Sequence, residues 1–102
     1  MGLTIYHVNV RNWKKIKYPL SIDINNYNPD FILLNETSLN SLDIPLLPGF
    51  NTIAKSNGPN AGAAILIKKD IKYEPLILVD QNTVAVKVFT NLGPFIICTN
   101  LK

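Results

Sequence analysis

Residues 28–37 read Asn-Pro-Asp-Phe-Ile-Leu-Leu-Asn-Glu-Thr, and this stretch is the most informative about the fold. The opening Asn-Pro-Asp triplet is a turn signal. The four apolar residues that follow, 31–34, form a continuous run that is typical of a strand buried on both faces. The polar triplet at residues 35–37 closes that run. The sequence therefore predicts an interior strand with polar groups at its carboxyl end.

Upstream of this strand, residues 3–10 alternate and contain β-branched and aromatic residues, which predicts another strand. Between the two strands, Pro19 suits a first helical position, and Leu20, Ile24 and Tyr27 share one helical face. The spacing predicts a short helix there. Residues 16–24 also fit a period of two, so a strand is the alternative.

Downstream, strands are predicted at residues 50–54, 63–68, 76–79, 84–89 and 95–99. Turn signals separate them, and the last two are joined by a hairpin at residues 91–94 in which Gly93 can take a positive φ. No internal repeat or linker appears, so residues 1–102 are expected to form one unit. The fold class predicted is α+β, a mostly antiparallel sheet with one or two short helices.

Composition excludes several classes of protein. The formal net charge of +3 is too small to be a nucleic-acid footprint by itself. Cys98, the only cysteine, rules out an internal disulfide and a zinc finger, and its apolar strand predicts a small buried side chain. No charged leader precedes an apolar run, and no run approaches the ~18 residues of a membrane span. We expect an intracellular protein without a membrane partner, in either the nucleus or the cytoplasm.

The order of the signals resembles the endonuclease/exonuclease/phosphatase family, in particular the apurinic-type endonucleases of LINE-type (non-LTR) retrotransposons. In that family the first strand ends in Asn, the second ends in Gln-Glu-Thr, and a Gly-Gly-Val-Ala-Ile-Leu strand follows. The matching features here are Asn9, Asn-Glu-Thr at 35–37, Pro-Gly-Phe at 48–50, Ala-Gly-Ala-Ala-Ile-Leu at 61–66 and the hairpin into residues 95–98.

This sequence departs from the family pattern at single positions and in length. Asn35 replaces the usual Gln, Ala61 and Ala63 replace a Gly and a Val, and Asn12 stands where Gly is common. Family members are about twice as long and fold as a two-layer sandwich whose halves are related by an approximate two-fold. The resemblance implies that this chain is equivalent to the first half. The second half normally supplies an Asp-x-Asn pair, a late Asp and a catalytic His, which have no counterpart here.

The resemblance also implies a site. Glu36 would be the Mg²⁺ ligand and Asn9 would orient the phosphate or the ligand, so these two are the candidate catalytic positions. A charged strand end without a metal is the alternative for Glu36. Cations and aromatics follow the first strand and suit phosphate contact and base stacking, or a solvated surface. The nucleic-acid-binding candidates are Arg11, Asn12, Lys14, Lys15 and Lys17. His7 is expected to be a hydrogen-bonded core residue.

Half of a sandwich would leave an apolar sheet face in water, so a C2 homodimer through that face is expected. The motivation is strands 84–89 and 95–99, which are apolar on both faces apart from Lys87. A truncated, catalytically incomplete endonuclease-like domain that binds nucleic acid or a partner is the first function predicted. A Mg²⁺-dependent DNA endonuclease is the second. An unrelated small α+β protein remains the third.

Overall fold

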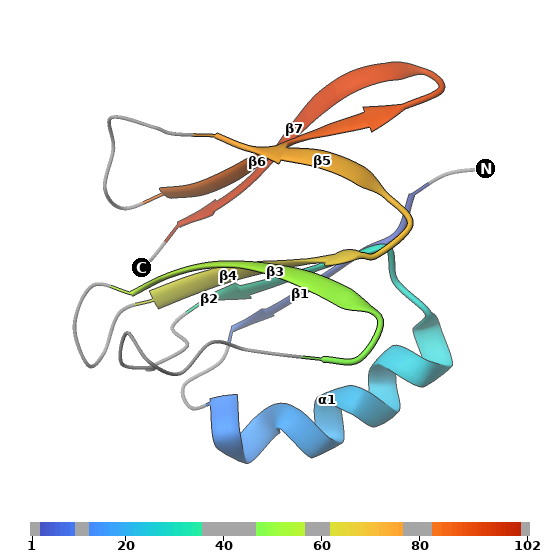
Figure 1. Cartoon of the computed structure of the whole chain (residues 1–102). Helices are drawn as coiled ribbons and strands as arrows, with labels where there is room; N and C mark the ends of the chain where they lie inside the picture. The colour runs from blue at the N-terminus through green and yellow to red at the C-terminus, as the bar shows by residue number, and fades with distance from the viewer. Residues whose placement is uncertain (1–2, 10–12, 36–46, 57–61, 77–82, 101–102) are drawn as a thin grey trace.

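A computed structural model describes residues 3–9, 13–35, 47–56, 62–76 and 83–100 of the chain (Figure 1). These residues form one helix and seven strands. In chain order the elements are β1 (Ile5–Asn9), α1 (Trp13–Tyr27), β2 (Phe31–Asn35), β3 (Phe50–Ser56), β4 (Gly62–Lys68), β5 (Lys72–Pro75), β6 (Thr83–Thr90) and β7 (Gly93–Asn100).

The strands form two sheets that are stacked on one another. The first sheet has the order β1-β2-β4-β3, and the second has the order β5-β6-β7. The β1–β2 pair is parallel and is connected through α1, whereas every other pair is antiparallel. In Figure 1, α1 covers one face of the first sheet and the second sheet covers the other. The predicted α+β class with mostly antiparallel pairing is confirmed.

Two apolar cores lie on either side of the first sheet. The core between α1 and the first sheet contains Leu20, Ile24, Ile32, Leu34, Leu47, Ala64 and Leu66. The core between the two sheets contains Phe31, Ala63, Ile65, Ile67, Val84, Val86, Val88 and Ile97. Alternate residues of β2 and β4 therefore contribute to opposite cores, which confirms the prediction that residues 31–34 are buried on both faces.

The inner faces of β6 and β7 do not need a second chain to cover them. Val84, Val86 and Val88 are buried against the first sheet of the same chain. One chain supplies two sheets, so these inner faces are covered within the chain, whereas the expected homodimer through an exposed sheet face stays a prediction. What stays exposed is the outer face of the second sheet, where Phe89 and Ile96 lie. Cys98 is also exposed there, so its prediction as a buried side chain is wrong.

The helix is longer than the sequence pattern predicts. It begins at Trp13, so Pro19 lies inside it rather than at its first position. A proline cannot donate the N–H bond to the carbonyl four residues earlier, but Pro19 is exposed, and packing of the opposite face holds the helix together. Leu20 and Ile24 are buried as predicted, whereas Tyr27 is exposed. The Ser21 hydroxyl donates to the Lys17 carbonyl at 2.8 Å.

The chain forms a strand that the sequence pattern does not predict. β5 covers Lys72–Pro75. A strand was expected at residues 76–79 instead; residue 76 is not part of a strand, and residues 77–79 lie outside the described ranges. Lys, Glu and Pro are depleted in strands, so β-propensity does not predict this edge strand. The predicted β6–β7 hairpin is confirmed, with Gly93 at φ 114°. Across the described ranges, no helix combines the length and apolarity that crossing a membrane requires.

Candidate functional site

The carboxyl ends of β1 and β2 meet at one end of the first sheet. Parallel pairing brings Asn9 into register with Asn35, so the two strand-end asparagines are neighbours. Helix α1 follows β1 after three residues, so its first turn starts from the same end of the sheet. Glu36 comes directly after Asn35 in the sequence but lies outside the described residues, and its role as a metal ligand stays a prediction.

His7 belongs to this end of the sheet as well. Its Nε2 atom donates a hydrogen bond to Oδ1 of Asn35, because an amide oxygen can only accept. The prediction of a core histidine is wrong, since His7 is exposed although it is hydrogen-bonded. The spacing of His7 and Asn9 was visible in the sequence, but the bond to Asn35 depends on the parallel register of β1 and β2.

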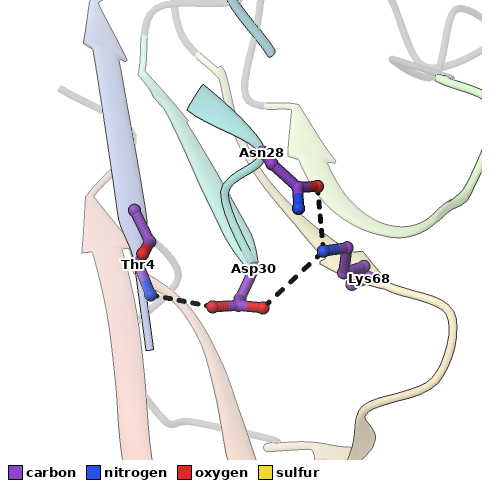
Figure 2. A network of polar contacts seen from close by, with 4 residues as sticks. All are labelled: Thr4, Asn28, Asp30 and Lys68. Carbon is purple, nitrogen blue, oxygen red and sulfur yellow. Dashed lines mark hydrogen bonds and ion pairs between the residues drawn. The ribbon is translucent and has the colours of Figure 1, made fainter. Parts of the chain in front are cut away.

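The opposite end of the first sheet is fastened by a polar network, shown in Figure 2. Asp30 accepts a bond of 2.8 Å from the backbone N–H of Thr4, and its other oxygen lies 3.9 Å from Nζ of Lys68. Lys68 also donates to Oδ1 of Asn28 at 3.0 Å. This network joins the start of β1, the start of β2 and the end of β4. Lys68 and Asp30 therefore have a structural role in joining these strands.

A second polar contact fastens β1 to the helix. The Tyr6 hydroxyl donates to Asp23 Oδ2 at 3.3 Å, and the Tyr6 ring lies 6.0 Å from the Tyr27 ring between centroids. Loss of hydration and, after it, the negative charge of Asp23 raise the pKa of Tyr6 above 10.0, its ordinary value. This contact lies on the helix side of the sheet and holds β1 in place.

The predicted nucleic-acid-binding residues follow β1 along the chain. Arg11 and Asn12 lie outside the described residues, and of Lys14 and Lys15 the structure describes only the backbone, in the first turn of α1. That turn contains no acidic residue. Lys17 is half-buried, and Tyr18 next to it is highly exposed. Backbone N–H groups at a helix start attract anions, and lysines there add to this preference.

A metal centre receives no support from the side chains that the structure describes. Among them, no three His, Cys, Asp or Glu residues gather closely enough to hold a metal ion. At the carboxyl ends of β1 and β2 the described groups are an imidazole and an amide, which can orient phosphate oxygens by hydrogen bonds, but neither is the carboxylate through which Mg²⁺ is usually bound. Magnesium binding depends on Glu36 and stays a prediction.

No family model and no curated protein matches the sequence. Among solved structures, the endonuclease domain of TRAS1, a telomere-specific non-LTR retrotransposon, is similar with a TM-score of 0.74 and 17% identity. The similarity covers 97% of this chain and 44% of that domain, so the chain spans less than half of its structural neighbour. The resemblance drawn from the sequence is confirmed for the fold: this chain is folded like part of a retrotransposon endonuclease domain.

Proposed function

We propose that this chain is an endonuclease-like half-domain of retrotransposon origin that binds nucleic acid or a protein partner as a dimer and does not cleave by itself. The observation that carries this proposal is the fold similarity, which extends over 97% of the chain but only 44% of the TRAS1 domain. The resemblance assigns most catalytic groups to a second half. A chain with only Glu36 and Asn9 of that set would hold a phosphate better than it would hydrolyse one.

The start of α1 is the surface we propose for nucleic acid. Asn9 ends β1, and α1 begins at Trp13, so the first helical turn follows the strand end at which the resemblance places the phosphate. Lys14 and Lys15 lie in that turn, which itself contains no acidic residue. Tyr18 offers an exposed ring on which an unpaired base can stack. Together these features suit a single-stranded or locally opened nucleic acid.

Oligonucleotide binding tests this surface. We expect a labelled single-stranded oligonucleotide to bind with an affinity that falls steeply as salt is raised. Lys14→Ala/Lys15→Ala should weaken binding and flatten the salt dependence, and adding Lys17→Ala should weaken it further. The matched control is Lys69→Ala/Lys72→Ala, which removes the same charge from two exposed lysines near β5. Equal losses from both pairs would refute the assignment, because they would reflect net charge alone.

The second candidate is a Mg²⁺-dependent DNA endonuclease. When bound, Mg²⁺ would polarise the scissile phosphate. Glu36 would hold the ion and Asn9 would orient a phosphate oxygen, as the resemblance implies. Register between Asn9 and Asn35, the residue before Glu36, favours this alternative because it brings the two positions to one sheet end.

Nicking of supercoiled and abasic plasmid in the presence of Mg²⁺ separates the two functions. The half-domain proposal expects no nicking above that of a Glu36→Ala sample prepared in parallel. Nicking by the wild-type chain that disappears in both Glu36→Ala and Asn9→Ala would establish the enzyme instead. Nicking of equal rate in all three proteins would point to a contaminant and remove Glu36 and Asn9 from the site.

A further inference from the structure

We propose that a second copy of this chain docks on the open side of the sandwich, the side on which β1 and β7 are the edge strands. This inference deepens the proposed function, since it names the surface of the dimer. It also replaces the exposed sheet face, which the sequence suggested, by a different contact surface.

The two sheets are offset relative to one another. β7 packs over β4 and β2, while β6 packs over β4 and β3. Since the first sheet runs β1-β2-β4-β3 and the second runs β5-β6-β7, the free edge of β7 lies on the same side as the free edge of β1. β3 and β5 are the edges of the opposite side. In the described part of the chain, the second sheet thus ends one strand short of β1.

The exposed fractions of neighbouring side chains on β1 and β2 reflect this offset. Ile5 and Phe31 are in register on neighbouring strands, so both side chains point toward the second sheet. Phe31 is 0% exposed and packs edge-on against Phe95 of β7, with ring centroids 6.4 Å apart. Ile5 is 49% exposed, and His7 on the same face is exposed too. The core between the sheets is therefore open along β1.

The edges of the two sides differ in charge. On the opposite side, β5 contains Lys72, Glu74 and Pro75, and β3 contains Lys55. Charges and prolines at an edge are the usual protection against pairing with another sheet. β1 and β7 contain no Asp, Glu, Lys or Arg, and their only such device is Pro94 near the start of β7. The open side thus combines unprotected edges with exposed apolar side chains.

A second copy is the occupant that fits this arrangement. A two-fold axis running between the sheets would bring β1 of one copy to β7 of the other, and would do so twice in one closed contact. Each free edge would gain a neighbouring strand, and each half-exposed Ile5 would be covered. A partner of a different kind would need to offer two uncharged edges at the spacing of two stacked sheets, which this chain already has.

Sedimentation equilibrium at micromolar concentration tests the proposal with aspartate variants of exposed apolar residues. We expect the wild-type chain to dimerise and Ile5→Asp to weaken the dimer tenfold or more, because two unpaired carboxylates would be buried. Phe89→Asp, on the outer face of the second sheet (42% exposed), and Ile22→Asp, on the outer face of α1 (63% exposed), should leave the dimer intact. Leu3→Asp, just ahead of β1, provides a second variant if Ile5→Asp fails to fold by circular dichroism.

The outcomes separate this inference from the proposed function. A wild-type monomer, or a dimer lost in Phe89→Asp but kept in Ile5→Asp, overturns the open side as the interface. Oligonucleotide binding measured on the same samples is the independent readout. A monomer that still binds oligonucleotide refutes this inference and the dimer of the proposed function but leaves the nucleic-acid role standing, whereas an Ile5-dependent dimer without binding upholds the inference and refutes the nucleic-acid role.

Discussion

The two sides of the sandwich are built from the same kinds of strand but end in different ways. On the side of β3 and β5, the edges contain Lys55, Lys72 and Glu74. On the side of β1 and β7, the described edges are uncharged, and Ile5 lies half-exposed beside the fully buried Phe31. Burial along these edges is therefore decided by where the second sheet stops, and only the side of β3 and β5 is protected against further pairing.

The largest change in the free energy of unfolding is expected for Phe31→Ala, with Ile5→Ala as its comparison, both in dilute protein. Both side chains face the second sheet in register. Phe31→Ala should lower the free energy of unfolding by about 3–5 kcal/mol, because it leaves a cavity. Ile5→Ala should cost only about 1 kcal/mol, since half of its side chain is already in water. Urea denaturation measures both, and equal losses would mean that β1 is covered after all.

The next largest loss of stability is expected on breaking the Asp30 network, which joins the start of β1 to β2 and β4. Asp30→Ala removes the acceptor of the Thr4 N–H and the partner of Lys68, which should cost about 1–3 kcal/mol. Asp70→Ala, an exposed carboxylate in the turn after β4, should change stability by less than about 0.5 kcal/mol. Thermal denaturation compares them. If the two variants behaved alike, the Asp30 network would contribute nothing to holding β1 in place.

Removing the charges of β5 should make this sheet edge able to pair with another chain. Lys72→Val/Glu74→Val removes both charges from β5 and should produce new, concentration-dependent association that light scattering detects. The matched control is Lys69→Val/Asp70→Val, which removes the same two charges from the turn before β5. Association of similar extent in both variants would attribute the effect to added hydrophobicity and not to the sheet edge.

The smallest effect is expected at Tyr6, which ties β1 to α1. Its pKa is raised in the folded state by loss of hydration and by Asp23, so the folded chain holds the proton more tightly than the unfolded chain. This contribution to stability is fully present below pH 10.0 and is lost as pH rises through the raised pKa. Tyr6→Phe should therefore flatten the decline of the melting temperature between about pH 9 and 11. An unchanged decline would contradict the assignment.

The sequence predicted the strands whose apolar residues have a clear pattern, and it missed those that depend on tertiary context. Residues 31–34 are apolar without interruption because both of their faces are covered. β5 was missed because only Tyr73 among its residues packs against the core. The start of α1 was missed because Pro19, a signal for helix beginnings, lies on the exposed face of a longer helix.

The candidate site was less predictable than the fold for a physical reason. Exposure of His7 and Cys98 depends on how far each sheet is covered, which no local pattern encodes. The bond between His7 and Asn35 requires a parallel register that only the fold supplies. Asn9 and Glu36 came from a family resemblance, and Glu36, Arg11 and Asn12 lie outside the described residues, so their roles remain predictions.

Hydrogen exchange of backbone amides at two protein concentrations tests the open side most directly. We expect amides of β1 and β7 to exchange more slowly in concentrated than in dilute protein, because each strand gains a neighbour in the dimer. Amides of β5 and of its neighbouring turn should exchange at the same rate in both samples. Rates in β1 and β7 that do not change with concentration, or protection that appears at β5 instead, would contradict it.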